Sequence, residues 1–328
     1  MREGSEQEIM ATINCVTYNH SAFIRQALES FLMQKTDFEY EILIHDDAST
    51  DGTGDIIREY AAKYPDKIRP LIQTENQYSK GIDNISGAFN FPRARGKYIF
   101  MCDGDDYFCS PDKLQKQVDY METHPECTLC IHSAKIELMG KAVAERQMRP
   151  YHETKVLSPE DMIDKSSGYA MSSMAFPLKI VKELPDYYVD CPVGDTPIQL
   201  MAAANGFGYY MDEPMSVYRV GVAGSWTVEG KKGDYAEKQK VYYERMKSVY
   251  EKFDIATEGR FKESAKSASL RTYFHTMVNT RNFKEILKPE FRSYYKELTA
   301  ANRFFIKLEC YAPGIYHALR AAFIGKKG

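Results

Sequence analysis

Asp103, Asp105 and Asp106 place three carboxylates within four residues, separated only by Gly104. They directly follow Tyr98–Met101, an apolar run of the kind that forms a buried strand. Carboxylates at i and i+2 can bind a hard cation such as Mg²⁺ or Mn²⁺ and leave coordination positions for phosphate oxygens. The alternative is a polar turn, since Asp and Gly are common turn residues. Three mutually repelling carboxylates favour the cation site.

Asp46 and Asp47 follow the apolar run Ile42–Ile44 in the same way. A carboxylate at the end of a strand can accept a hydrogen bond from a base or from a ribose hydroxyl. The alternative role is to cap a helix that is expected to start near Thr50.

Thr17, Tyr18 and Asn19 follow a third apolar run, Ala11–Val16. The Tyr18 ring can stack on a base, and the alternative is an aromatic side chain at the rim of the site. The sequence contains neither G-x-G-x-x-G nor G-x-x-x-x-G-K-[ST], which argues against a dinucleotide cofactor and against P-loop hydrolysis.

The elements that position these side chains alternate between strands and helices over roughly the first 140 residues. Ile24, Ala27, Leu28 and Phe31 form one apolar stripe, which predicts the first helix. Such alternation predicts an α/β fold, a Rossmann-like, mostly parallel sheet flanked by helices. Ligands gather at the carboxyl ends of its strands, where all the polar clusters above fall. Strands are predicted at residues 11–16, 40–44, 68–72, 97–101 and 128–138.

The second half of the chain has a mixed pattern. Met171–Phe176 predicts a strand, and Pro197–Asn205 predicts a helix that Gly206 ends. Gly208–Val220 is predicted to be a strand pair or one extended segment. Beyond Lys231 the chain is predicted to be helical.

Length and composition narrow the class of protein. The 328 residues suffice for two domains, or for one large domain with an appendage. Hydrophobic residues at 44% and charged residues at 27% exclude a disordered or fibrous chain, and the net charge of −3 gives no indication of nucleic-acid binding. Seven cysteines, with one C-x-x-C at Cys127 and Cys130 in an apolar run, predict a reduced protein without a disulfide framework. No secretory signal or membrane-spanning stretch is seen, so a cytoplasmic protein is expected.

Charge is distributed unevenly along the chain. Residues 227–328 carry 21 Lys and Arg against 12 Asp and Glu, whereas residues 1–226 carry 22 against 34. We therefore divide the chain into a domain at 1–226 and a helical, basic extension at 227–328. Apolar residues alternate with basic ones from Phe304 to Lys327. This segment can lie on the anionic surface of the cytoplasmic membrane, or it can pack on the first domain.

Five motifs in order resemble the family 2 glycosyltransferases of the GT-A fold, of the kind that builds bacterial surface polysaccharides. The resemblance covers about residues 9–226. The motifs are Thr17-Tyr18-Asn19, Asp46-Asp47-Ala48-Ser49-Thr50-Asp51-Gly52-Thr53, Asp103-Gly104-Asp105-Asp106 with Pro111-Asp112-Lys113-Leu114, Gly194-Asp195-Thr196-Pro197, and Asp212-Glu213-Pro214-Met215-Ser216-Val217-Tyr218-Arg219.

The resemblance implies a site for a UDP-sugar and a Mn²⁺ or Mg²⁺ ion. Tyr18 and Asp47 would contact the uracil, with Thr17, Asn19 and Asp46 in the same nucleotide site. Asp103 and Asp105 would form the D-x-D that touches ribose and metal, with Asp106 as an alternative metal ligand.

The resemblance also implies a reaction. The sugar would pass with inversion to a carbohydrate or lipid-linked acceptor. Asp195 would be the general base that deprotonates the acceptor hydroxyl, and its alternative role is to cap the helix behind Pro197.

One position departs from the family pattern. Many relatives carry a histidine where this chain has Gly221, so a metal or diphosphate contact is absent there. Arg219 and Lys80 can compensate as phosphate partners, or they can be solvated surface cations. His20 and His45 border the site, where a structural role is the alternative.

Two other classes of function compete with glycosyl transfer. A nucleotidyltransferase also uses a metal-bound carboxylate pair, but it needs a basic, glycine-rich phosphate loop, which Thr17–His20 does not supply. A non-catalytic nucleotide-sugar or partner-binding module would not need Asp195 together with Asp103 and Asp105. The sequence leaves both a monomer and a homodimer open.

Overall fold

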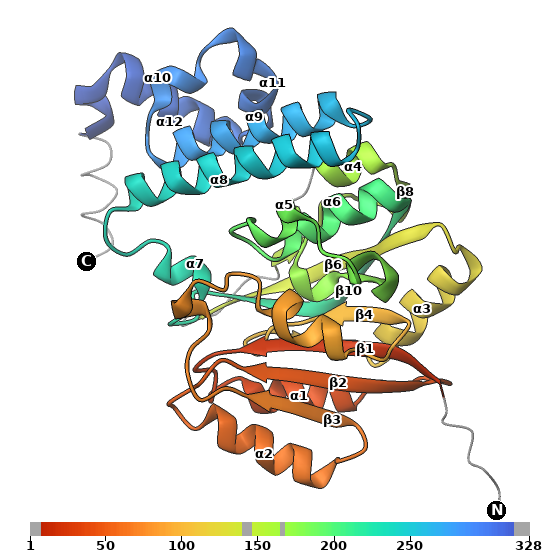
Figure 1. Cartoon of the computed structure of the whole chain (residues 1–328). Coiled ribbons are helices and arrows are strands. Elements are labelled where there is room, and N and C mark those ends of the chain that lie inside the picture. Colours follow the sequence, from red (N-terminus) through yellow and green to blue (C-terminus); the bar gives the residue numbers. More distant parts are fainter. Residues whose placement is uncertain (1–7, 140–145, 165–167, 318–328) are drawn as a thin grey trace, which may run out of the picture.

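A single mostly parallel sheet forms the centre of the molecule (Figure 1). The computed structural model describes residues 8–139, 146–164 and 168–317. Its strands are β1 (Ile9–Thr17), β2 (Glu39–Asp46), β3 (Ile68–Ile72), β4 (Tyr98–Met101), β5 (Tyr107–Phe108), β6 (Cys127–Leu138), β7 (Arg146–Met148), β8 (Lys155–Leu157), β9 (Ala175–Pro177) and β10 (Phe207–Val220).

The strand order is β3-β2-β1-β4-β9-β6-β10-β5, with β7 on β6 and β8 on β10. β3, β2, β1 and β4 run parallel, as do β6 and β10, while β9 lies antiparallel between β4 and β6. Parallel strands end at the same edge, so β1, β2 and β4 deliver their following loops to one rim. The predicted α/β fold with a mostly parallel sheet is confirmed.

Helices cover the sheet and continue into the C-terminal region. In α1 the predicted stripe of Ile24, Ala27, Leu28 and Phe31 is completely buried. The longer helices α8 and α9 lie side by side over α5 and α6, at the end of the molecule opposite to α2 (Figure 1). The helices are α1 (Ile24–Leu32), α2 (Thr53–Lys63), α3 (Lys113–Thr123), α4 (Pro159–Asp164), α5 (Asp186–Val189), α6 (Asp195–Asn205), α7 (Trp226–Glu229), α8 (Tyr235–Ala256), α9 (Lys262–Asn279), α10 (Phe283–Ile286), α11 (Arg292–Glu297) and α12 (Ala300–Tyr311).

The hydrophobic core continues from the sheet into the C-terminal helices. Leu200 of α6 shares one buried cluster with Met246 and Phe253 of α8. A smaller cluster joins α9 to α12 through Phe274 and Ile306. The boundary after residue 226 stays a prediction, but α8 packs directly on the part of the chain that precedes it.

One local prediction needs adjustment, and another is decided between its two alternatives. The predicted strand Met171–Phe176 is a 3-10 turn at Met171–Ser173 followed by the short strand β9. The turn forms because the buried Ser173 hydroxyl donates to the Ala170 carbonyl at 2.7 Å. By contrast, Gly208–Val220 belongs to one continuous strand, which β5 and β8 both join. Among the described helices, none has the length and hydropathy to cross a membrane.

Candidate active site

The loop after β4 carries the Asp103–Asp106 carboxylates and is held tightly against β1. The Gly104 amide donates to the Val16 carbonyl at 2.9 Å, and the Asp106 amide donates to the Asp103 carbonyl at 3.0 Å. A Cβ added at Gly104 would lie 2.5 Å from Oγ1 of Thr17. Thr17 is therefore buried beneath the loop and forms part of its support.

Gly104→Ala is expected to destabilise the protein, because the new methyl group meets Thr17 and the Cδ1 atom of Ile24, at 3.1 Å. Overpacking of this kind costs about 1–3 kcal/mol. Chemical denaturation measures the loss, and Gly314→Ala serves as the control, since nothing lies within 4 Å of its added Cβ. Equal stability of the two variants would show that the loop yields without cost.

Carboxylates from two distant parts of the chain lie within electrostatic range of each other at this loop. Burial, followed by the neighbouring charges of Asp105 and Asp195, raises the pKa of Asp103 to about 7. Asp195 comes from the first turn of α6, and burial also raises its pKa above the ordinary value. The predicted metal ligands and the predicted base therefore lie close together in the folded chain.

The carboxylate set fits a hard cation with few protein ligands. Like charges held together in a buried place are what a divalent ion neutralises. Within residues 8–139, 146–164 and 168–317, no group of three or more His, Cys, Asp or Glu side chains is arranged to hold a metal. An ion at Asp103 and Asp105 would thus take its remaining oxygens from phosphate and water.

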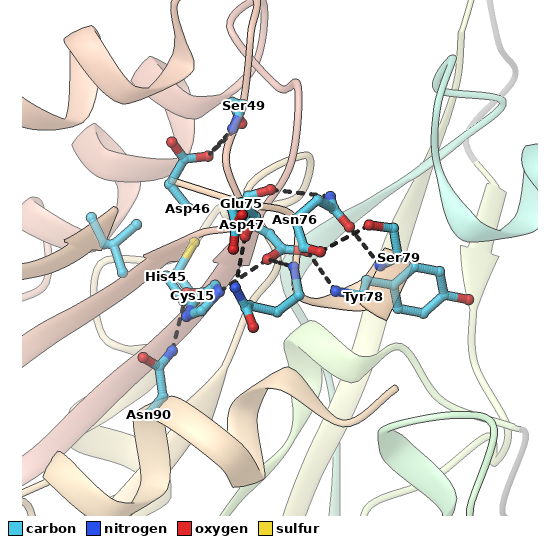
Figure 2. A network of polar contacts seen from close by, with 12 residues as sticks. Cys15, His45, Asp46, Asp47, Ser49, Glu75, Asn76, Tyr78, Ser79 and Asn90 are labelled. Carbon is cyan, nitrogen blue, oxygen red and sulfur yellow. Dashed lines mark hydrogen bonds and ion pairs between the residues drawn. The ribbon is translucent and has the colours of Figure 1, made fainter. Parts of the chain in front are cut away.

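Asp47 organises the loop that follows β3 (Figure 2). Its carboxylate oxygens accept the backbone amides of Gln77 at 2.7 Å and Tyr78 at 3.1 Å. Its carbonyl accepts the Asn76 side chain at 3.1 Å, and Nε2 of His45 lies 3.5 Å from the carboxylate. Tyr78, which sequence reasoning missed, is thereby fixed near the site while 47% of it stays exposed.

Asp46 is held differently. Oδ1 accepts the backbone amide and the hydroxyl of Ser49, while the buried Oδ2 atom has no hydrogen-bond partner among the described residues. The capping alternative for this acidic pair is wrong, because α2 begins at Thr53 and Asp51 accepts the Thr53 amide at 3.0 Å.

Asn19 joins the loops after β1 and β2. It has a left-handed backbone with φ of 54°, its side-chain oxygen accepts the Thr50 amide at 2.8 Å, and its own amide donates to the Ser49 hydroxyl at 2.8 Å. Tyr18, between Thr17 and Asn19, is 41% exposed and is available to a ligand.

Arg219 is a buried support of the Asp103–Asp106 loop. Only 5% of it is exposed, its guanidinium donates to the Asp105 carbonyl at 2.6 Å, and its amide donates to Oδ1 of Asp106 at 2.8 Å. The alternative of a solvated surface cation is therefore wrong for Arg219. Lys80 is exposed and pairs with Glu75.

His20 and His45 are held by contacts within the protein. Nδ1 of His20 bonds Oγ1 of Thr17 at 3.1 Å, and its Nε2 lies 3.9 Å from Asp105. His45 is fully buried against Phe89. Gly221 has φ of +89°, a conformation that strains any side chain, so the loop here is shaped for glycine.

Lys113, the first residue of α3, is completely buried. The sequence alone assigns it no role of its own. Its Nζ donates to Oε1 of Gln117 at 2.6 Å and lies over the rings of Phe100 and Phe108. Burial lowers the pKa of the Lys113 ammonium to about 7. A lysine in an amphipathic pattern is normally assigned to solvent, so the pattern could not reveal this burial.

The Lys113 environment predicts a pH dependence of stability. An unfolded lysine titrates at about 10.4, so between about pH 7 and 10 the unfolded chain binds up to one more proton than the folded chain. The free energy of unfolding of the wild type should therefore rise with pH relative to Lys113→Met, by up to about 1.4 kcal/mol per pH unit. Urea titrations at pH 7 and pH 9 measure this difference. Parallel profiles would contradict it.

The sequence and the fold of this chain are similar to those of known proteins. A family model described as glycosyl transferase family 2 matches residues 12–176. This chain belongs to glycosyltransferase family 2. The matched segment begins in β1 and ends in β9, so it contains the strand-end loops that carry Tyr18, Asp47 and Asp105.

The chain is also similar to individual relatives and to a solved structure. The Mycobacterium tuberculosis protein Rv1520 is 34% identical over 221 residues, which cover 66% of this chain and 60% of the relative's length. The Escherichia coli UDP-Glc:alpha-D-GlcNAc-diphosphoundecaprenol beta-1,3-glucosyltransferase WfaP is 37% identical over 116 residues, 35% of this chain and 42% of WfaP. The structure of Staphylococcus aureus TarS 1–349 with UDP-GlcNAc matches 90% of this chain and 78% of TarS at a TM-score of 0.58 and 16% identity, which shows a shared GT-A fold.

Proposed function

We propose that this chain transfers a sugar from a UDP-sugar to a hydroxyl of a carbohydrate or lipid-linked acceptor, with inversion at the anomeric carbon. The observation that carries the proposal is that the half-buried Asp103 carboxyl feels the charges of both Asp105 and Asp195, which come from separate parts of a family 2 chain. An inverting transfer needs a cation near the departing diphosphate and a separate carboxylate near the attacking hydroxyl.

The nucleotide is proposed to lie between the loops after β1 and β2. Tyr18 would stack on the uracil, and Asp47 would accept its N–H. Each carboxylate oxygen has two lone pairs, so Asp47 can hold the loop amides and still bind a base. The unpartnered Oδ2 of Asp46 adds a second acceptor nearby. WfaP is named for its donor UDP-Glc and the TarS structure contains UDP-GlcNAc, and both favour uridine.

The metal is proposed to be Mn²⁺ or Mg²⁺ on Asp103 and Asp105. When bound, it would neutralise the charge that develops on the leaving diphosphate. Asp106 is the alternative ligand, but its Oδ1 already accepts the Arg219 amide. Arg219 supports the loop, and Lys80 would reach the phosphates only by leaving Glu75.

Asp195 is proposed to be the general base. It accepts the Thr196 amide at 2.7 Å, which orients the carboxylate at the start of α6. Burial and then the charge of Asp195 raise the pKa of the Tyr242 phenol, so this residue of α8 lies within electrostatic range of the proposed base.

UDP with Mn²⁺ is expected to raise the melting temperature of the full chain, whereas GDP is not. A ligand at 100 times its Kd stabilises a protein by about 2.7 kcal/mol. Tyr18→Ala should weaken UDP binding by about 1–3 kcal/mol, the value of one stacked base. Tyr311→Ala, which removes a more exposed tyrosine on α12 (77% against 41% for Tyr18), is the control. Stabilisation by GDP and not by UDP would refute the uridine assignment.

A further inference from the structure

Helix α12 has two apolar faces, and only one of them is covered. Ile306, 5% exposed, packs in the small cluster with Phe291 and Tyr294. On the outer side Phe304 is 57% exposed and Tyr311 is 77% exposed. These two residues are seven positions apart, so they lie on the same face, two turns from each other.

The uncovered face extends beyond these two aromatic side chains. Phe305 is 39% exposed, and Ile315, just past the end of α12, is 58% exposed. Scattered single apolar residues on a surface are ordinary, but here four large ones are exposed along twelve positions of one segment, and the rings of Phe304 and Phe305 lie 5.5 Å apart. We call Phe304, Phe305, Tyr311 and Ile315 the α12 stripe.

Basic side chains border the α12 stripe. Lys307 lies between its aromatic residues in the sequence, and Lys284 of α10 lies near Cys310 of α12. Across the part of the chain that the structure describes, no ion pair involves Lys284, Lys296 or Lys307. Along the sequence, residues 227–328 carry a basic surplus and residues 1–226 an acidic excess.

We infer that the α12 stripe is a docking surface for an anionic lipid bilayer. Aromatic side chains in a helix flanked by lysines match the interface between headgroups and acyl chains, which such helices enter on one side. The anionic surface would attract the C-terminal end and repel the acidic body. This orients α10–α12 toward the lipid and α2, at the opposite end in Figure 1, away from it.

A second copy of the chain fits the stripe less well. A stable protein interface buries about 800 Å² on each partner, more than four side chains supply. A symmetric dimer presents the same patch from both copies, so the unpaired lysines around one stripe would face those around the other. The inference goes beyond the proposed function, because it concerns neither the donor nor the reaction.

The test is co-sedimentation of the full-length protein with vesicles of phosphatidylcholine, alone or with about a third phosphatidylglycerol. Binding is expected only with the anionic lipid and should fall at high salt. The double variant Phe304→Ser with Tyr311→Ser should lower the bound fraction on the order of tenfold, because each ring withdraws apolar area from water. Ile255→Ser, which removes a residue that is 77% exposed on α8, is the control and should bind as the wild type does.

Circular dichroism and UDP titration establish that the double variant is folded. Equal vesicle binding by the wild type and the folded double variant would overturn the inference, as would a wild type that ignores anionic vesicles. A wild-type dimer that the double variant converts to a monomer would show instead that a second copy covers the stripe.

Discussion

Replacing Asp195 by asparagine should lower the rate of sugar transfer by about 10²–10⁴, the usual contribution of a general base. The affinity for UDP should stay close to that of the wild type, because Asp195 is proposed to act on the acceptor and not on the donor. The fold should survive, since the asparagine side-chain oxygen can still accept the Thr196 amide. Turnover assays and calorimetric titration with UDP measure the two effects separately.

Asp190→Asn is the matched control for this experiment. Asp190 lies five residues earlier, is exposed and pairs with Lys252 of α8, outside the carboxylate group. It should therefore leave turnover nearly unchanged. Wild-type turnover in Asp195→Asn, or a large loss in Asp190→Asn, would place the base elsewhere.

UDP binding should depend on Mn²⁺ or Mg²⁺, and Asp105→Asn should remove that dependence. Loss of a direct ligand is expected to weaken binding in the presence of Mn²⁺ by at least about tenfold, since even outer-shell changes cost 10–100-fold. In EDTA the variant and the wild type should bind UDP equally weakly. Calorimetry with and without metal gives all four values.

Asp106→Asn separates the two possible ligand sets. Asparagine can still accept the Arg219 amide, so the support of the loop is kept. Metal-dependent binding should persist in this variant if Asp103 and Asp105 hold the ion. Its loss in Asp106→Asn, together with normal behaviour of Asp105→Asn, would move the metal to the alternative ligand. Equal UDP affinity of the wild type with Mn²⁺ and with EDTA would refute a metal role altogether.

The polar clusters at the strand ends can be predicted from the sequence, because the apolar runs mark where each strand ends. The β-branched and apolar runs end where polar clusters begin, and in a parallel sheet those ends must meet. Tyr18, Asp47 and Asp103 were therefore placed correctly relative to their strands, and the α1 stripe was identified from its spacing.

The supports of the site were not predictable in the same way. Arg219 and Lys113 are charged residue types that pattern arguments assign to solvent, yet both are buried because aromatic rings and hydrogen-bond acceptors from other elements surround them. Tyr78 stands in a segment without periodicity, and its backbone amide is held by the side-chain carboxylate of Asp47. The packing of α8 on the sheet domain depends on long-range contacts, which composition and charge do not report.

Release of UDP from a panel of UDP-sugars, measured with Mn²⁺ and with water or added saccharides as acceptor, tests the central claim most directly. The wild type is expected to release UDP from at least one donor, and Asp195→Asn is expected to bind that donor without releasing UDP at a comparable rate. A wild type that binds UDP with Mn²⁺ but consumes no donor in the panel would contradict the claim and favour a non-catalytic nucleotide-sugar-binding module.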